Sequence, residues 1–396
     1  MTAAPLAKNR IQSIDILRGV IMLIMAIDHT REFFHIGATS YDATDMKTTY
    51  PTLFFTRWIT HFCAPTFVFL SGVSAYLAGT RRTKAQFSSF LIKRGLWLVV
   101  VEVVLITLAF SLNPLYNGIA LQVIWAIGVS MIILGAVVWL PVQVIGVIGL
   151  VLVVGHDLLT SLKLPPESTE DVLMKIFFTA RGSLFFLDAN HVVFDLYAIL
   201  PWTGVMMLGY TFGTLYRADR KPESRRAFLL FSAVALFGAF ILLRLLNAYG
   251  DPAPWSVQKN HIFTLMSFLN VSKYPPSLMY CCLTLSVGLF VLAVTENARG
   301  KLAAFFKVYG GVPFFYYVLH FYLIRLLTVV VFFAQGFKTS QIITPNVPFL
   351  FVPPGMGFSL GVVYLLWLGI ILTLYYPCRW FLNYKKTHSQ WWLSYL

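Results

Sequence analysis

The side chains best suited to proton transfer lie in a short run near the N-terminus that contains Asp28, His29, Arg31 and His35. Another histidine, His61, follows at the start of the string His-Phe-Cys-Ala-Pro-Thr. Histidine titrates near neutral pH, so one imidazole can act as a base while a second imidazole or a carboxylate orients it. The sequence predicts acid–base or nucleophilic catalysis by His29, oriented by His61 or Asp28, with His35 as an alternative base. Arg31, Lys273 and Tyr317 are the candidates to stabilise an oxyanion, and the sequence does not choose among them.

Further ionisable residues are spaced by whole helical turns and are therefore expected to share helical faces. Asp15, Arg18 and His29 are spaced by three and eleven residues, which match whole helical turns and predict one polar stripe. His191 and Asp195 are spaced i and i+4 at the expected start of another helix, so that one could orient the other. Structural explanations remain open: an ion pair for Asp15 with Arg18, and an ordinary interhelical hydrogen bond for the histidines.

Later parts of the chain add a second group of candidates. Tyr317 and His320 fall within one helical turn, Lys273 precedes a Tyr-Pro-Pro string, and Glu102 is a candidate partner for a buried cation. No HxxH or HExxH spacing occurs, so no metal site is expected.

Membrane-spanning helices must position these residues. Hydrophobic residues make up 58% of the 396 residues and charged residues 12%, against about 25% charged in soluble domains. A helix needs roughly 20 apolar residues to cross a bilayer, which leaves room for about ten crossings. The apolar runs are continuous and not alternating, which argues against a β-barrel. The expected fold class is therefore all-α: a polytopic integral membrane protein with a single transmembrane domain over residues 1–396.

Ten hydrophobic runs are expected to cross the membrane. They lie near residues 13–30, 56–79, 92–112, 118–139, 141–157, 190–215, 227–248, 275–295, 312–334 and 357–382. Eighteen of the thirty Lys and Arg residues fall on the side of the N-terminus, which the positive-inside rule makes cytoplasmic. This predicts an N-in, C-in orientation in the inner (plasma) membrane, with the long loops at 158–189 and 249–274 outside.

Most of the basic residues behind the net charge of +14 lie on the expected cytoplasmic side. The charge is therefore explained by membrane orientation and does not indicate nucleic-acid binding. Lys93 and Arg94 open the third crossing next to a basic turn that holds Arg81, Arg82 and Lys84. Such a cluster could hold the phosphates of a ligand, or it could be a topology signal with affinity for anionic lipid.

Two separated motifs resemble those of transmembrane acyltransferases. One is Asn-Arg-Ile-Gln-Ser-Ile-Asp-Ile-Leu-Arg-Gly at 9–19, followed by His29, and the other is Gly-Val-Pro-Phe-Phe-Tyr-Tyr-Val-Leu-His at 311–320. Within that superfamily, the pair Asp28-His29 and the strings at 61–72, 200–206 and 273–277 resemble the bacterial relatives of heparan-α-glucosaminide N-acetyltransferase. The resemblance covers nearly the whole chain.

The resemblance implies a membrane enzyme that moves an acetyl group from cytoplasmic acetyl-CoA to an amine or hydroxyl, often of a sugar, on the non-cytoplasmic side. The chain departs from heparan-α-glucosaminide N-acetyltransferase itself, the lysosomal enzyme, in two ways. The loop after the first crossing differs in length, and His29 and His61 stand at helix positions where the lysosomal enzyme has other residues. The catalytic imidazole is therefore expected on the helices. Residues expected to bind the donor are Lys93, Arg94, Arg18, Tyr317, His320 and Lys273.

A runner-up interpretation uses the same buried groups as a proton pathway in a secondary transporter or lipid-handling protein. The expected partners are acetyl-CoA, a small-molecule or glycan acceptor and the lipid bilayer, with no nucleic acid and no metal. The sequence leaves open a homo-oligomer, the identity of the acceptor, and the choice between direct transfer and an acetyl-histidine intermediate.

Overall fold

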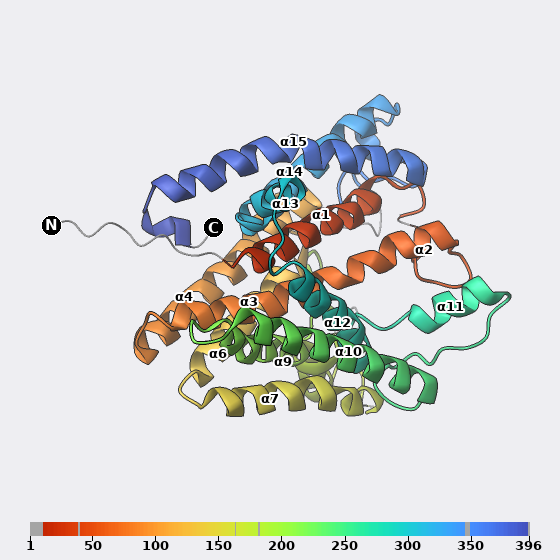
Figure 1. Ribbon diagram of the computed structural model, residues 1–396. Helices are drawn as coiled ribbons and strands as arrows, with labels where there is room; N and C mark the ends of the chain where they lie inside the picture. The colour runs from red at the N-terminus through yellow and green to blue at the C-terminus, as the bar shows by residue number, and fades with distance from the viewer. Residues whose placement is uncertain (1–10, 39, 163, 181–182, 345–348, 395–396) are drawn as a thin grey trace.

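The computed structural model describes residues 11–38, 40–162, 164–180, 183–344 and 349–394. These residues form a bundle of helices (Figure 1) and one small sheet. The first half of the chain contains α1 (Gln12–Phe34), α2 (Pro51–Trp58), α3 (Cys63–Gly79), α4 (Lys84–Val101), α5 (Thr107–Ser111), α6 (Val123–Val137), α7 (Val142–Gly155) and α8 (Thr169–Met174). The second half contains α9 (Ile199–Phe212), α10 (Pro222–Leu246), α11 (His261–Leu269), α12 (Leu278–Val294), α13 (Lys301–Gly310), α14 (Pro313–Ala334) and α15 (Leu360–Thr387).

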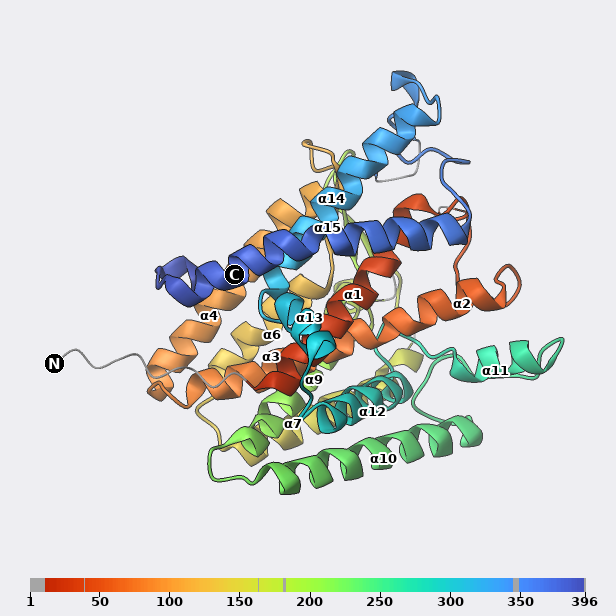
Figure 2. The same ribbon diagram turned by 45° about the horizontal axis from the view of Figure 1, so that its top comes forward.

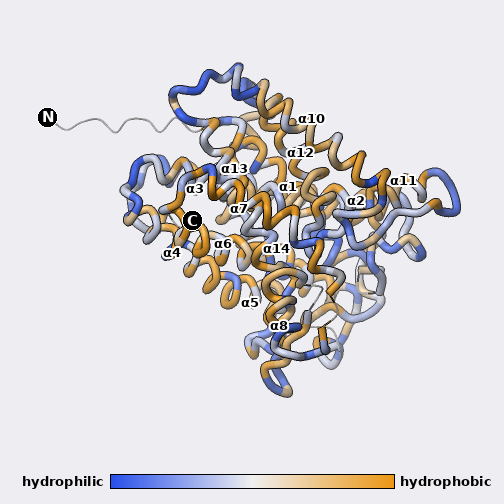
Figure 3. Tube along the Cα trace, turned by 90° about the horizontal axis from the view of Figure 1, so that it is seen from below, coloured by the Kyte–Doolittle hydropathy of each residue, from blue (hydrophilic) through white to orange (hydrophobic). Residues whose placement is uncertain are grey.

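Several of these helices have the length and composition of membrane spans. Among the described residues, five segments qualify, and two shorter helices are also apolar. The five are Pro51–Gly79, Val142–Thr160, Pro222–Leu246, Pro313–Ala334 and Leu360–Thr387, and the shorter two are Val123–Val137 and Leu278–Val294. Figure 3 shows the helix bodies in the colours of apolar residues, with the most hydrophilic segments in the connections. The chain is therefore a mostly helical membrane protein.

Helix α1 lies in the middle of the bundle. In Figures 1 and 2 it runs between α13, α14 and α15 on one side and α3 and α12 on the other, and it packs against all five. Glycines permit the close crossing of α1 and α13: a Cβ at Gly19 would lie 2.0 Å from the carbonyl oxygen of Phe306, and one at Gly310 would lie 1.7 Å from that of Asp15. Small residues at such crossings are typical of membrane helices. The central position buries the polar residues of α1.

A small sheet forms where two of the expected crossings begin. It contains β1 (Gly118–Leu121), β2 (Ser183–Phe186) and β3 (Val192–Asp195) in the order β1-β3-β2. Strand β1 is parallel to β3, and β2 is antiparallel to it. The string Val-Val-Phe in β3 is β-branched and aromatic, which favours a strand. The all-α expectation did not include this sheet.

The sheet overturns one sequence-based expectation about side-chain geometry. The helix expected over 190–215 begins only at Ile199, because β3 and a short connection occupy the preceding residues. His191 and Asp195 are therefore not one helical turn apart. Instead, Nδ1 of His191 lies 2.8 Å from the carboxylate of Asp188, and Asp195 accepts a hydrogen bond from the backbone N–H of Tyr197 at 3.2 Å.

Two buried carboxylates cap helices. Glu102 accepts the backbone N–H of Trp125 in the first turn of α6 at 3.0 Å, so the expected role of Glu102 as a cation partner is replaced by a helix cap. Asp157 accepts the N–H of Leu278, the first residue of α12, at 2.9 Å. Carboxylates at helix N-termini satisfy free N–H groups and the positive end of the dipole.

Candidate active site

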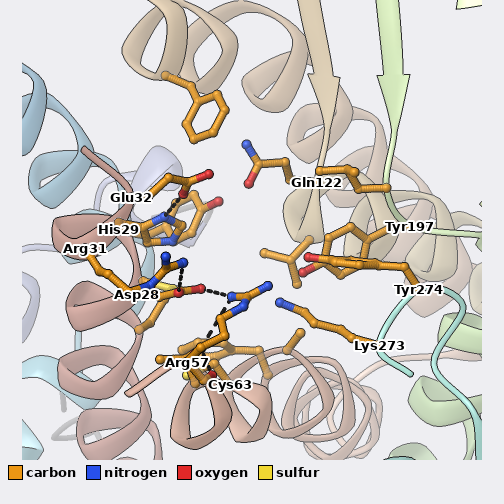
Figure 4. Close-up of a pocket in the computed structure, with 18 residues that line it drawn as sticks. Asp28, His29, Arg31, Glu32, Arg57, Cys63, Gln122, Tyr197, Lys273 and Tyr274 are labelled. Carbon is orange, nitrogen blue, oxygen red and sulfur yellow. Dashed lines mark hydrogen bonds and ion pairs between the residues drawn. The ribbon is translucent and has the colours of Figure 1, made fainter. Parts of the chain in front are cut away.

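A cavity of about 110 Å³ lies beside the C-terminal half of α1. Its walls come from α1, the junction of α2 with α3, α5, the start of α6, the segments that precede α9 and α12, and α14. The charged side chains among its described lining residues are Asp28, Arg31, Glu32, Arg57 and Lys273. Figure 4 shows the residues of α1 on one side and Tyr197, Tyr274 and Lys273 on the other, with Arg57 between them. The cavity thus combines a histidine, His29, with two carboxylates and three cations.

Asp28 holds two arginines at the wall of this cavity. Its Oδ1 lies 3.0 Å from Nη2 of Arg31, one turn later on α1, and its Oδ2 forms an ion pair with Nη1 of Arg57. Because Arg57 belongs to α2, Asp28 connects two helices. Charged groups at membrane depth persist when they are paired or hydrated, and each of these three has such a partner. The pairing fixes the position of α2 relative to α1 at the cavity.

His29 lines the cavity beside Glu32. Nδ1 of His29 lies 3.6 Å from Oε2 of Glu32, which is within ion-pair distance. The imidazole packs against two rings of α14, with centroid separations of 4.3 Å to Phe321 and 5.3 Å to His320. A carboxylate beside one ring nitrogen favours a proton on that nitrogen and leaves the other free to accept one. At 3.6 Å the two atoms are beyond hydrogen-bond distance, and Nδ1 of His29 has no hydrogen-bond partner within the described residues. His29 can therefore act as a base with a carboxylate close to one ring nitrogen.

The opposite wall of the cavity carries hydrogen-bond donors. The ammonium of Lys273 lies 5.0 Å from the ring centroid of Tyr274 and 5.9 Å from that of Tyr197, and Figure 4 shows it directed towards Arg57. Burial raises the pKa of Tyr197 well above its ordinary value, so its hydroxyl keeps its proton. An ammonium and a phenol facing a histidine across a small cavity can stabilise negative charge that develops on a reacting oxygen.

One known family matches a large part of the chain. The family model described as heparan-alpha-glucosaminide N-acetyltransferase, catalytic, matches residues 10–246. The chain belongs to this family. A comparison with curated proteins finds no match. Membership in the heparan-alpha-glucosaminide N-acetyltransferase family places the chain broadly among membrane acetyltransferases. The match includes His29, Glu32 and Arg57, whereas Lys273 and α14 lie beyond it.

In this member of the N-acetyltransferase family, His61 does not line the described cavity. Pro65 lacks the N–H that would bond to the carbonyl of His61, four residues earlier. The hydroxyl of Tyr280 donates to that carbonyl at 2.7 Å, and the two rings pack with centroids 5.6 Å apart. The segment turns here as a 3-10 helix over Ile59–Phe62. The imidazole that the structure shows in contact with His29 is that of His320, while the role predicted for His61 in orienting His29 stays a prediction.

His35 also lies outside the described lining of the cavity. It follows the end of α1, where its Nδ1 accepts the backbone N–H of Gly37 at 3.3 Å and its Nε2 lies 3.4 Å from the hydroxyl of Tyr50. Burial and the nearby charge of Arg31 both lower the pKa of His35. The structure therefore holds His35 as a neutral imidazole at the base of the loop after α1.

The two expected residues on α14 occupy different positions. Tyr317 lines the cavity. His320 lies behind it and is fully buried. Its ring is stacked on Tyr316 with centroids 5.4 Å apart and an interplanar angle of 2°. Nδ1 of His320 lies 3.2 Å from the carbonyl oxygen of Tyr316, and its Nε2 has no hydrogen-bond partner within the described part of the chain.

The expected inner basic residues lie away from the cavity lining. Arg18 is 3.5 Å from Asp15 on α1 and donates a hydrogen bond to Ser74 on α3. Lys93 is exposed on α4, and Arg94 beside it is partly buried. The structure therefore brings Asp28, His29, Arg31, Lys273 and Tyr317 to one cavity, but not these three cations.

Other residues line the cavity without having been selected from the sequence. Among the polar ones are Glu32, Arg57, Gln122, Tyr197 and Tyr274. Glu32 had a local signal, since it follows His29 by three residues and so shares its helical face. The others come from separate elements, and no spacing relates them to His29. Within the described residues, no group of three or more His, Cys, Asp or Glu side chains is arranged to hold a metal ion.

Proposed function

We propose that this protein transfers an acetyl group from cytoplasmic acetyl-CoA to an amine or hydroxyl, in our expectation that of a sugar, on the non-cytoplasmic side of the membrane. The observation that carries the proposal is the pair of His29 and Glu32, which lines a cavity shared with three cationic side chains. A neutral imidazole can accept the proton of the acceptor, and cations can stabilise the oxyanion. Family membership supports acetyl-CoA as the donor.

The proposed reaction proceeds at the thioester carbonyl. The proton on the acceptor nitrogen or oxygen moves to Nε2 of His29 while the acceptor nitrogen or oxygen forms a bond to the carbonyl carbon. The carbon–sulfur bond then breaks, and the CoA thiolate takes the proton from the imidazolium. Glu32 beside Nδ1 stabilises the imidazolium that forms between these two steps. In the alternative with two stages, Nε2 itself bonds to the carbonyl carbon and the carbon–sulfur bond breaks, which gives acetyl-histidine and the CoA thiolate. The acceptor nitrogen or oxygen then bonds to the acetyl carbon, the carbon–Nε2 bond breaks, and the acceptor proton passes to the released thiolate.

The three cations of the cavity have different environments. Arg31 and Arg57 both pair with the carboxylate of Asp28, whereas Lys273 lies against two aromatic rings on the opposite wall. We therefore assign Lys273 to the oxyanion of the reacting carbonyl. We assign Asp28, which directly precedes His29 in the sequence, the role of holding the two arginines in place.

The proposed topology has ten crossings, with both termini in the cytoplasm. Helices of the structure overlap each of the ten apolar runs, and the distribution of Lys and Arg supports the orientation. A single cysteine placed at Glu223 should resist an impermeant reagent added to intact cells. Modification from outside would reverse the orientation and move the acceptor to the other side of the membrane.

The donor is proposed to enter from the cytoplasm with its phosphates near Lys93 and Arg94. These residues do not line the cavity, so they would contact the nucleotide end of acetyl-CoA and not its thioester. Replacement of both by Ala should weaken acetyl-CoA affinity by about tenfold, a loss typical of one or two charged contacts. Isothermal titration of acetyl-CoA measures this, and an unchanged dissociation constant would reject the inward donor site.

A direct test of the function uses His29. His29→Ala should lower the transfer of radiolabelled acetyl groups from acetyl-CoA to glucosamine by at least about 100-fold, the contribution typical of a general base. Acetyl-CoA affinity should stay within about twofold, because the imidazole contributes mainly to the transition state. His261→Ala, which alters an exposed histidine on α11, is the matched control. Near wild-type turnover in His29→Ala would show that another residue is the base.

A further inference from the structure

A second cavity, of about 150 Å³, adjoins the first and is called the side chamber here. Glu32, Phe110 and Leu196 line both cavities. The remaining lining residues of the side chamber are Thr107, Ser111, Gly118, Ala120, Phe194 and Phe349. The side chamber therefore begins at the carboxylate that faces His29 and extends between α5 and the sheet.

The side chamber is apolar on nearly every wall. Its two hydroxyls donate within their own helical segment: Thr107 to the carbonyl of Glu102 at 3.1 Å, and Ser111 to that of Thr107 at 2.8 Å. Glu32, at the boundary with the first cavity, is the charged residue of the described lining. Apolar cavities of about 150 Å³ take ligands such as benzene, which has six carbons. The side chamber is therefore suited to a short hydrocarbon group and not to a sugar or a phosphate.

Small residues on one strand create this space. Gly118 and Ala120 are two positions apart on β1, so they face the same side of the sheet, whereas Ile119 between them faces the other. Ala120 pairs in register with Phe194 of β3, which projects from the same face of the sheet and also lines the side chamber. A large side chain at Ala120 would fill the chamber, while the same change at Ile119 would leave it open.

We infer that the side chamber binds the acyl chain of the donor, so that the enzyme accepts acyl groups of about four to six carbons as well as acetyl. This inference rests on the proposed function. The chain of an acyl group starts at the carbon next to the reacting carbonyl, and the chamber starts one helical turn from His29. A polar acceptor has no group that fits there. The transfer itself is unchanged: the acyl carbon leaves sulfur and bonds to the acceptor.

The test is titration of the full protein, in lipid nanodiscs, with acetyl-, butyryl-, hexanoyl- and decanoyl-CoA. Each buried methylene should strengthen binding by about fourfold. Butyryl-CoA should therefore bind about fifteenfold more tightly than acetyl-CoA. The gain should stop near hexanoyl, because the chamber then has no room for further methylenes. An affinity that is equal for all chains, or that rises without limit up to decanoyl, would overturn the inference.

Three variants separate binding in the chamber from partition into the lipid. Ala120→Phe should remove the gain from acetyl to hexanoyl while leaving acetyl-CoA affinity within about threefold, and Phe349→Ala should extend the gain to longer chains. Ile119→Phe, on the other face of β1, should behave as the wild type. Thermal unfolding of each variant checks that it is folded. If Ala120→Phe keeps the gain and Phe349→Ala does not extend it, the chain binds elsewhere and the inference fails.

The outcomes also distinguish this inference from the proposed function. Binding of acetyl-CoA without any dependence on chain length would leave the function standing and reject the side chamber as an acyl site. Absence of acetyl-CoA binding in the wild type would reject both. n-Hexyl β-D-glucoside serves as a probe for an apolar group on the acceptor. If Ala120→Phe weakens its binding while the acyl-CoA series is flat, the chamber belongs to the acceptor and the inference is wrong.

Discussion

Asp28 on α1 and Arg57 on α2 form an ion pair that joins the two helices beside the cavity. The same carboxylate holds Arg31 at 3.0 Å, so Asp28→Asn would leave two largely buried arginines without their counter-charge. Removal of one partner from a buried charge cluster typically costs about 3–5 kcal/mol. We expect a lower thermal midpoint in detergent and loss of activity together.

The matched control for this prediction is Asp219→Asn. Asp219 also pairs with an arginine, Arg217, at 3.2 Å, but both side chains are more than half exposed. Surface pairs contribute little, so the midpoint should stay close to that of the wild type. Equal stability of Asp28→Asn and Asp219→Asn would show that the Asp28 cluster does not hold α1 and α2 together.

The contact between His29 and His320 leads to a second prediction. His320→Phe keeps a ring of similar size beside His29 but removes the polar nitrogens. If His320 positions the base, kcat should fall by about tenfold or more with little change in KM. The double variant with His29→Ala should lose no further activity, because the two would act as one unit.

His61→Phe is the comparison for that experiment. The ring of His61 packs on Tyr280 and not on His29, so this variant should keep kcat while affecting stability. Loss of kcat in His61→Phe that is non-additive with His29→Ala would restore the sequence-based pairing of these two histidines. It would also remove the positioning role from His320.

Lys273 gives a third prediction. Lys273→Met preserves most of the apolar stem and removes the charge. If the ammonium stabilises the oxyanion, kcat should fall by about 100-fold, as for other single oxyanion donors. Lys259→Met is a suitable control. Lys259 lies in the loop before α11, where its ammonium is 3.8 Å from the ring centroid of Phe263, and it does not line the described cavity. Equal activity of the two variants would contradict the assignment.

The features that depend on local spacing could be predicted from the sequence. Apolar runs marked the helices because a bilayer demands continuous hydrophobic length. Asp28, His29 and Arg31 are predictable because they end such a run on α1, and all three line the cavity. Glu32 could have been selected in the same way, since an i and i+3 spacing places it beside His29.

The features that depend on contacts between distant segments could not be predicted. Arg57 reaches Asp28 only because α2 packs against α1. The position of His61 depends on Tyr280 of α12, whose hydroxyl donates a hydrogen bond to the backbone carbonyl of His61. That carbonyl is free because Pro65 has no N–H to donate to it. The strand at Val192–Asp195 forms because it pairs with β1 and β2. An apolar run of four residues is compatible with either a strand or a helix until such partners are known.

The last prediction concerns the pH dependence of stability and rests on Asp195, which lies in β3 outside the spanning helices and is 1% exposed. Burial raises the pKa of Asp195 to about 7. The unfolded chain therefore releases this proton at lower pH than the folded protein does. The contribution to stability is fully present below about pH 4 and is lost as the pH rises through about 7, with an upper limit of about 4 kcal/mol. The temperature of the thermal unfolding midpoint should accordingly decrease as the pH is raised from 5 to 8.

Asp195→Asn tests this directly, because the amide oxygen can still accept the N–H of Tyr197 but cannot ionise. The variant should show a smaller decline between pH 5 and pH 8 and should be more stable than the wild type at pH 8. Asp188→Asn is the control: hydrogen bonds from the backbone of Asn190 and from His191 lower the pKa of that exposed carboxyl, so its removal should leave the decline in place. A wild-type decline that persists unchanged in Asp195→Asn would assign the pH dependence to another group.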